Sequence, residues 1–593
     1  MSDTFKHEYT RRDFLKLSWT VSAGVVVPAL LSACNNGDGS DTPETTFPQP
    51  QTLQSVNGVL DITLNLAYLD TTLYGTKVSL RNMSGTIPAP TLLLNVGDTL
   101  RIKLVNSLPP NPQDRDEPPH LRYHNSTNLH THGFHVYPGI IREPSSFSAG
   151  LYGDYVLDDP EKGVHPGQSR QYEYEIRQDH PAGVYWYHPH LHGSSAMQVG
   201  SGMAGAVLIK GPIDQVPEIA AAAERVFVFQ APFQFVTPPS TVGTIDNFAQ
   251  VANNPTSEPA FLVNGLRRPR LTMRSGEVQN WRFVNASIWK FLNLSLDGHV
   301  LNIYGHDGNP RHDLKPSGPF SLNDPTMPDG VVLAPGNRNS ILVRAGVPGT
   351  YFLRTMAFEM GRASNQGASI LADDVLVEVV VLDELQPMEL PRAPFPVTPF
   401  LAPITDEELA AHGGLKRNIV MRVVFNPNGA PITQPPASLI VHPGDDLDDW
   451  VYTNPSITPP PSITNKVFAL GSAGVQASPN PGMPAEYIPF QSTRALTQTV
   501  AFDSVEEWTI LNMNNIRHPF HIHVNPMYIV KINGRAIEPY WADTIGLPPD
   551  GSPEVPTTVT FRMRFVHYSG PYVMHCHMLV HEDMGMMQGV TVA

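Results

Sequence analysis

Cysteine is almost absent from this sequence, which contains only Cys34 and Cys576 in 593 residues. Two cysteines cannot build a disulfide-rich scaffold, a four-cysteine zinc site or an iron–sulfur cluster held by cysteines alone. Charged residues are also scarce, at 16%, against roughly 25% in an average soluble domain. Their balance is acidic, with a formal net charge of −16. This disfavours nucleic-acid partners, because binding nucleic acid relies on basic patches against phosphates.

Long apolar runs are missing as well, since no stretch after the N-terminus approaches the ~20 residues of a membrane-spanning helix. Proline is abundant instead, with 59 residues. High proline with low charge disfavours a helical bundle and favours many short strands joined by long turns.

The N-terminal segment is typical of an export signal. Residues 10–16 contain paired arginines and precede a weakly apolar run at 17–33. Arg11-Arg12 followed by Asp-Phe-Leu-Lys resembles a twin-arginine signal. We therefore expect residues 1–34 to direct the protein to the periplasm or the cell envelope.

Leu31-Ser-Ala-Cys34 resembles a lipoprotein cleavage box, in which Cys34 would carry a lipid anchor; an ordinary signal-peptidase site nearby is the alternative. Residues 35–54 are polar and rich in turn formers, and we expect a disordered tether there. Cys576 is then the only thiol of the folded part. In an oxidising compartment an exposed thiol is a liability, so we expect Cys576 to be buried or bound.

Three long stretches share one pattern, short β-branched runs separated by Gly, Pro and Asn turns. Thr91–Val96, Leu271–Phe283 and Thr557–Arg564 are examples. This pattern predicts an all-β protein built of sandwiches or barrels. The expected divisions are domains at 55–213, 214–386 and 418–593, with a proline-rich linker at 387–417.

Histidine is in excess, and twelve of the 23 histidines fall into four short clusters. On a strand, residues two apart point to the same face. The pairs that can each present two imidazoles to one site are His130 with His132, His188 with His190, His521 with His523, and His575 with His577. His135 and His192 lie beside these clusters without a ligand position.

Cys576 lies between His575 and His577 and points to the opposite face, so three consecutive residues can serve two metal sites. A thiolate, two imidazoles and a weak thioether form a blue-copper electron-transfer site, and this set is supplied by Cys576, His518, His581 and Met586. The eight paired histidines then suffice for three more copper ions with open positions for dioxygen. Zinc is the alternative metal, but it needs about four ligands and would leave most of these histidines unexplained.

Together these motifs resemble the multicopper oxidase family. The motifs are HTHG at 130–133, WYHPH at 186–190, HPFHIH at 518–523 and HCHMLVHEDMGM at 575–586. The resemblance covers essentially the whole mature chain. It implies three tandem cupredoxin-like Greek-key β-sandwich domains, of which the middle one lacks copper ligands and serves as a spacer that shapes the approach of substrate.

The resemblance also implies four copper ions and assigns their ligands. The type 1 ion takes His518, Cys576 and His581, with Met586 as the axial group. The type 2 ion takes His130 and His521. The type 3 pair takes His132, His188 and His577 on one ion, and His190, His523 and His575 on the other.

Reduction of dioxygen consumes protons, so carboxylates are expected near the cluster. Glu582 follows His581 directly and matches an acidic position of the family. Asp154 is the candidate in the first domain, and a solvated loop acid is the alternative for Glu582.

The resemblance implies an enzyme that couples one-electron oxidation of a phenol, aromatic amine or similar small reductant to four-electron reduction of dioxygen to water. The alternative is a metallo-oxidase for Cu(I), Fe(II) or Mn(II). The sequence lacks a long Met-rich insertion, which favours the laccase-like activity. A copper-free envelope assembly protein is a third interpretation, opposed by the complete ligand set. We expect a monomer.

Overall fold

The computed structural model describes residues 47–593 except 74, 112–115, 118–119, 122, 144–149, 159–161, 233–241, 253–260, 318–330, 363–367, 426–438, 442–465, 477–484, 489–496, 550 and 552–554. The predicted signal at 1–34, with Cys34, and residues 35–46 of the predicted tether lie outside the described residues. Among those described, no helix is both long and apolar enough to cross a membrane.

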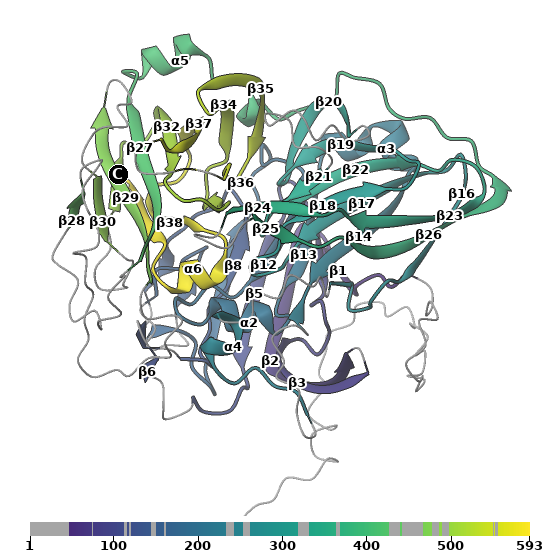
Figure 1. Cartoon of the computed structure of the whole chain (residues 1–593), viewed down its shortest axis with the longest axis horizontal. Coiled ribbons are helices and arrows are strands. Elements are labelled where there is room, and N and C mark those ends of the chain that lie inside the picture. The colour runs from purple at the N-terminus through teal and green to yellow at the C-terminus, as the bar shows by residue number, and fades with distance from the viewer. Residues whose placement is uncertain are drawn as a thin grey trace, which may run out of the picture. The chain divides into compact units, whose positions relative to one another are not determined.

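Strands dominate the fold (Figure 1), and most belong to pairs of sheets drawn from three successive stretches of the chain. The first stretch gives a sheet ordered β1 (Thr52–Gln54), β4 (Thr91–Asn95), β13 (Gly205–Lys210), β12 (Gly183–His188) and β8 (His130–His132). Its second sheet is ordered β3 (Thr76–Met83), β2 (Val59–Leu73), β5 (Thr99–Asn106), β11 (Ser169–Glu175), β10 (Leu151–Tyr152) and β9 (Ile140–Arg142).

The middle stretch again forms two sheets. One is ordered β15 (Leu262–Val263), β14 (Ala223–Gln230), β17 (Val278–Asn285), β22 (Arg338–Arg344), β19 (Leu301–His306) and β20 (Asn309–Ser317). The other is ordered β16 (Arg270–Ser275), β26 (Asp374–Leu385), β23 (Gly349–Thr355), β18 (Leu292–Leu296) and β21 (Val331–Leu333).

The last stretch repeats the arrangement. Its larger sheet is ordered β28 (Leu439–Val441), β30 (Ala485–Ile488), β29 (Lys466–Gln476), β27 (Lys416–Phe425), β32 (Ser504–Asn512), β37 (Thr557–Phe565), β34 (Met527–Ile532) and β35 (Arg535–Ala542). Its smaller sheet is ordered β31 (Thr497–Val500), β39 (Met587–Val592), β38 (Gly570–Cys576), β33 (Pro519–Ile522) and β36 (Thr544–Gly546). Two short ribbons pair β24 (Phe358–Arg362) with β25 (Ala368–Leu371), and β6 (Asp116–Glu117) with β7 (His120–Leu121).

Helical segments are short and lie between strands. They are α2 (Ser195–Gly200), α3 (Pro217–Ala221), α4 (Phe248–Ala252), α5 (Asp406–Ala411), α6 (Leu579–Asp583) and the 3-10 turns η2 (Pro212–Gln215) and η4 (Pro399–Leu401). The all-β prediction is therefore confirmed.

The alternation of side chains along the strands explains why the sheets pair. In β5, Leu100, Ile102 and Leu104 are buried, whereas Arg101 and Lys103 between them are exposed. One face of this strand therefore contributes to the core of the first stretch and the other faces solvent. Strand β17 differs, because all of its residues are buried. It is covered on both faces.

The predicted disordered tether extends too far toward the C-terminus, because residues 47–54 of its predicted range, 35–54, belong to the fold. Phe47 is buried and its ring centroid lies 4.6 Å from that of Phe227. Thr52–Gln54 pairs in parallel with β4. The buried ring of Phe47 and the strand Thr52–Gln54 therefore anchor this polar, proline-rich segment to the fold.

The predicted linker is also packed against the fold. Phe395 and Leu401 are buried, and the Leu401 carbonyl accepts a hydrogen bond from Trp541 Nε1 at 2.8 Å. Helix α5 begins after Thr405, whose hydroxyl accepts the Glu408 amide. Phe395 belongs to a buried cluster with Ile213 and Tyr304, and Leu401 belongs to one with Val505 and Trp541, so these two side chains pack the linker against other parts of the chain. The domain boundaries themselves stay a prediction.

One buried ion pair joins neighbouring strands of the larger sheet in the last stretch, and its arginine also reaches the smaller sheet. Arg417 on β27 donates to both carboxylate oxygens of Glu506 on β32, at 2.6 and 2.9 Å, and to the Thr499 carbonyl on β31 at 2.7 Å. Trp508 Nε1 also donates to Glu506, at 2.8 Å. The Glu506 side chain is fully buried, so its charge depends on these donors.

We expect Arg417→Met to lower the free energy of unfolding by roughly 3–5 kcal/mol, because it leaves the buried Glu506 carboxylate without its cation. Denaturant unfolding of the metal-free protein measures this loss. Arg101→Met is the matched control. Its ion pair with Glu173 has the same 2.6 Å separation but is exposed, so little change is expected. Equal effects of the two substitutions would contradict the prediction.

Candidate metal centres

The first two histidine motifs lie side by side because β8 and β12 pair in antiparallel fashion. The register sets His130 opposite His188 and His132 opposite Trp186. His190 follows two residues after His188, just beyond the end of β12. All four histidines are buried. One edge of this sheet therefore presents four imidazoles to the interior.

The last two motifs are joined in the same way by β33 and β38. Their register sets His521 opposite His575 and Phe520 opposite Cys576. Since neighbouring residues of a strand point to opposite faces, the two histidines share one side and Cys576 lies on the other. The Cys576 amide donates to the Met586 carbonyl at 3.0 Å, which holds the following loop against the strand.

One candidate centre is formed by His518, Cys576 and His581. The separations are 3.4 Å from His518 Nδ1 to Cys576 Sγ, 3.6 Å from Sγ to His581 Nδ1 and 3.3 Å between the two nitrogens. The centre of such a triangle lies about 2 Å from each atom, close to the length of a metal–ligand bond. Met586 is buried beside it. His581 is the one ligand candidate of the three that is partly exposed.

Two further candidate centres contain three histidines each. His190 Nε2 lies 3.1 Å from His575 Nε2, which lies 3.3 Å from His523 Nε2. In the second set, His577 Nε2 lies 3.2 Å from His132 Nδ1, and His188 completes the group. Each set thus joins histidines from the two ends of the chain.

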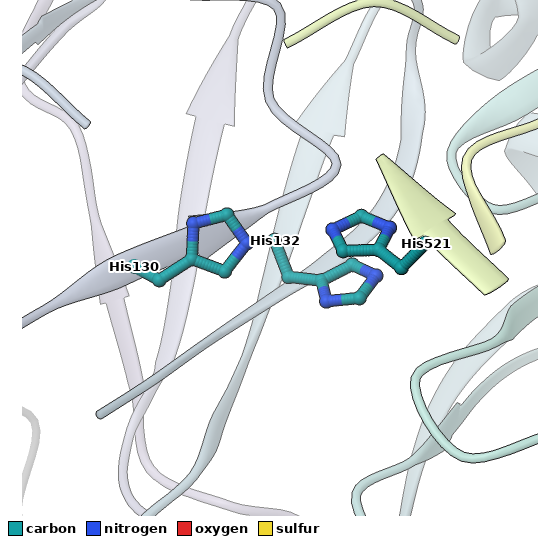
Figure 2. A group of neighbouring side chains, drawn as sticks. All are labelled: His130, His132 and His521. Carbon is teal, nitrogen blue, oxygen red and sulfur yellow. The ribbon is translucent and has the colours of Figure 1, made fainter. Parts of the chain in front are cut away.

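His130 and His521 form the remaining candidate pair, with His132 within reach (Figure 2). The Nδ1–H of His130 donates to Asp154 Oδ2, and that of His521 donates to the Asp543 carbonyl, both at 2.8 Å. These bonds fix the tautomers, so each ring turns the lone pair of Nε2 away from its partner. Neither Nε2 has a hydrogen-bond partner among the described residues.

These residues fit metal ions on two physical grounds. Buried polar atoms normally have partners, yet Nε2 of His130, His188 and His521 has none among the described residues. Burial also lowers the pKa of every buried candidate histidine, to about 3 for His518 and about 4 for His190, His521 and His575. The imidazoles are therefore neutral, which is the form that binds a metal.

Cys576 is buried, which agrees with the expectation from the sequence that this thiol is either buried or bound. Burial raises the pKa of its thiol. A set of one thiolate and two imidazoles suits copper, and so do the sets that contain imidazoles alone. A divalent metal at these positions would supply the missing partner for the orphaned nitrogens.

The two predicted carboxylates both lie against candidate ligands. Glu582 Oε2 is 3.2 Å from His575 Nδ1, Oε1 is 3.5 Å from His190 Nδ1, and Ser195 Oγ donates to Oε1 at 3.1 Å. Asp154 accepts from His130 and from the amide and hydroxyl of Thr131. Burial raises the pKa of both groups, that of Asp154 to about 7. Asp154 is therefore able to hold a proton near neutral pH, and burial shifts the pKa of Glu582 in the same direction.

The flanking histidines lie outside the ligand sets. His135 and His192 are both buried. His135 Nδ1 donates to the Val524 carbonyl at 2.8 Å, and its Nε2 lies 2.9 Å from His567 Nδ1.

Several residues that no motif indicated also contact the candidate ligands. Asp543 Oδ1 accepts from His132 Nε2 at 3.1 Å, and the same carboxylate is paired with Arg338 of the middle stretch. Asp583 accepts the amides of Gly193 and Ala196, next to the second motif. These contacts join loops that are far apart in sequence, so no local sequence pattern indicates them.

Comparison with known proteins agrees with this donor set. Three family profiles, each described as multicopper oxidase, match residues 120–213, 237–373 and 466–593, which is more than half of the chain. The chain is 22% identical over 538 residues to Laccase-2 of Botryotinia fuckeliana, covering 86% of this chain and 78% of the relative. It is 22% identical to multicopper oxidase mco of Staphylococcus aureus, covering 94% of each.

Solved structures show the same fold. A multicopper oxidase from Campylobacter jejuni, described as a metallo-oxidase, has a TM-score of 0.61 and 20% identity, covering 92% of this chain and 96% of that one. A laccase-like multicopper oxidase from Ochrobactrum sp. has a TM-score of 0.61 and 20% identity, covering 92% and 100%.

The fold and donor set define a copper-dependent oxidoreductase of cupredoxin-like domains that uses dioxygen as acceptor. The chain belongs to the multicopper oxidase family. Both the family and the all-β class expected from the sequence are confirmed, and copper with a reducing substrate follows from the family.

Proposed function

We propose that this enzyme is laccase-like: it oxidises phenols or similar small reductants one electron at a time and reduces dioxygen to water with four copper ions. The proposed type 1 ligands are His518, Cys576, His581 and axial Met586. The proposed type 2 ligands are His130 and His521. The proposed type 3 ligands are His132, His188 and His577 on one ion and His190, His523 and His575 on the other.

The observation that carries this proposal is the place of Cys576 between two ligand candidates of other centres. Its Sγ lies in the triangle with His518 and His581. His575 Nε2 lies 3.1 Å from His190 Nε2, and His577 Nε2 lies 3.2 Å from His132 Nδ1. When bound, copper supplies one-electron redox chemistry at both ends of this three-residue link. A zinc enzyme would have no use for such a connection.

The protons that dioxygen reduction consumes are supplied through the protein's own side chains. Glu582 contacts His190 and His575, and Asp154 contacts His130, so one carboxyl group lies beside each of two ligand sets. Burial raises the pKa of both groups, which favours the protonated form that a proton donor needs. The Ser195 hydroxyl holds Glu582 in place at 3.1 Å.

The nature of the electron donor separates the two enzymatic interpretations. The partly exposed His581 gives a small organic donor access to the type 1 set. The sequence has no long Met-rich insertion, which favours the laccase-like activity over oxidation of Cu(I), Fe(II) or Mn(II). The complete donor set opposes a copper-free assembly role.

We also propose that the protein is exported by the twin-arginine route to the periplasm or cell envelope, with a lipid anchor at Cys34, and acts as a monomer. The paired arginines at 11 and 12 and the Leu31–Cys34 box support export and the anchor.

The first test is oxygen uptake by the copper-loaded protein with a diphenol or with Cu(I) as donor. We expect fast uptake with the diphenol in the absence of added Cu(I). Uptake mainly with Cu(I) would instead favour the metallo-oxidase and a role in copper tolerance. No uptake with either donor would contradict the oxidase proposal itself.

Cys576→Ser should abolish the blue colour and donor oxidation while leaving the fold and most of the other copper. The hydroxyl replaces the one thiolate of the type 1 set but leaves the eight paired histidines unchanged. Absorption spectra, copper analysis and circular dichroism measure these three properties. Donor oxidation at the normal rate in this variant would show that the proposed link through Cys576 is wrong.

Glu582→Gln should slow reoxidation of the donor-reduced enzyme by dioxygen by about 10²–10⁴-fold, because an amide cannot deliver a proton. Anaerobic oxidation of the donor should keep its rate. Stopped-flow absorption separates these two half-reactions. Glu277→Gln is the matched control, since the Glu277 side chain is buried and accepts hydrogen bonds from the Arg274 amide and from Gln279, neither of which is a candidate ligand. Reoxidation at the wild-type rate in Glu582→Gln would rule out this proton role.

A further inference from the structure

Arg338 is a fully buried cation whose N–H groups reach all three stretches of the chain. Its Nε donates to the Val184 carbonyl at 3.3 Å, in the first stretch. Nη1 and Nη2 donate to the carbonyls of Gly336 and Asp307 at 3.0 Å, in the middle stretch. The same two nitrogens bind Asp543 Oδ1 and Oδ2 at 2.7 and 2.5 Å, in the last stretch. A buried guanidinium is stable only with such complete pairing.

The Asp543 carboxylate forms the ion pair with Arg338 and also orients the ring of His132. Asp543 Oδ1 accepts His132 Nε2–H at 3.1 Å. This bond leaves the lone pair on His132 Nδ1, which lies 3.2 Å from His577 Nε2. The main-chain carbonyl of Asp543 accepts His521 Nδ1–H at 2.8 Å. One residue therefore sets the tautomer of two candidate copper ligands.

The loop that carries Asp543 is itself held by the middle stretch. Asp307 accepts the Arg338 amide at 2.8 Å, the Thr544 amide at 3.1 Å and the Asp543 amide at 3.3 Å. Asn337 Nδ2 donates to the Thr544 carbonyl at 2.8 Å. Both the side chain and the backbone at Asp543 are thus fixed by residues that bind no metal.

Gly336 brings the same turn directly against two ligand rings. Its φ is +89°, a conformation that glycine adopts at little cost. A Cβ there would lie 3.0 Å from His132 Cε1 and 3.0 Å from His577 Cδ2. The backbone therefore packs so closely on these rings that a side chain here would displace them by a few tenths of an ångström.

We propose that Arg338 and Gly336 are positioning residues for the trinuclear copper cluster, through Asp543 and the rings of His132 and His577. The middle domain is then more than a spacer, because its turn at 336–338 sets the geometry of ligands supplied by the other two. The inference rests on the proposed trinuclear site and concerns how well that site holds copper.

The experiment compares Arg338→Lys with Arg282→Lys in the copper-loaded full chain. Lysine keeps the charge of Arg338 but cannot bind both oxygens of Asp543 in a fork. Arg282 is the matched control because it is equally buried in the middle stretch, and its partners Glu224, Asp214 and Ser340 contact no copper ligand. Chelator competition gives the affinity for copper, and electron paramagnetic resonance gives the spectrum of the type 2 ion.

We expect Arg338→Lys to bind trinuclear copper about 10–100-fold more weakly than the control, the usual effect of removing an outer partner of a ligand. Its type 2 spectrum should shift, while the blue absorption stays, because His518, Cys576 and His581 make no contact with Arg338. Wild-type affinity and an unchanged spectrum in Arg338→Lys would overturn the proposal, whatever the loss in thermal stability.

Gly336→Ala provides a second test should Arg338→Lys fail to fold. Gly298→Ala is its control, because Gly298 also has a positive φ, of +65°, but a Cβ there meets only Tyr351, at 3.6 Å. We expect a shifted type 2 spectrum and weaker trinuclear copper in Gly336→Ala alone. Equal behaviour of the two alanine variants would overturn the role of Gly336. A wild-type protein that binds copper only at the type 1 site would overturn the proposed function, and this inference with it.

Discussion

Both kinds of candidate metal centre depend on the alternation of side chains at the end of β38. His575 and His577 face one side and Cys576 faces the other, because successive residues of an extended chain point in opposite directions. The pairing with β33 fixes the register, with His521 opposite His575 and Phe520 opposite Cys576. A slip of one residue would exchange the faces and place the thiol among the imidazoles.

The second constraint is the desolvation of the imidazoles. Six of the eight paired histidines come in mixed sets of three, so the first and last stretches must close on each other and exclude water. Burial keeps the rings neutral, and each ring then needs a partner for its N–H and another for its lone pair. Asp154 and Asp543 take the N–H groups of His130 and His132. The lone pairs remain, and nitrogens such as His130 Nε2 have no protein partner among the described residues, as the proposed copper sites require.

The structure brings together the residues that the sequence grouped as candidate ligands, because they lie in compact motifs whose spacing has a geometric meaning. The period of two along a strand was sufficient to group His130 with His132 and to separate Cys576 from its neighbours. The all-β class followed from the same kind of local pattern. Glu582 was found because it adjoins a motif residue.

Arg338 and Asp543 could not be predicted, because their meaning comes from contacts across 205 residues of sequence. The same reason explains the error at the predicted tether. Phe47 lies in a polar run, and only its contact with Phe227, far along the chain, shows that it is part of a core. Local composition describes what a segment can do alone, whereas burial against a distant partner decides what it does in the fold.

Helix α6 shows how a short element can serve two purposes at once. Glu582 turns toward His190 and His575, while the adjacent Asp583 turns toward α2. Asp583 Oδ1 accepts the Gly193 amide at 2.7 Å and Oδ2 accepts the Ala196 amide at 2.8 Å. These bonds hold the segment that carries Ser195, whose hydroxyl binds Glu582. The Glu582 carboxyl group is therefore positioned by its own neighbour, through a loop of the first stretch. A movement of that loop would disturb both the candidate ligand His190 and the carboxyl group beside it.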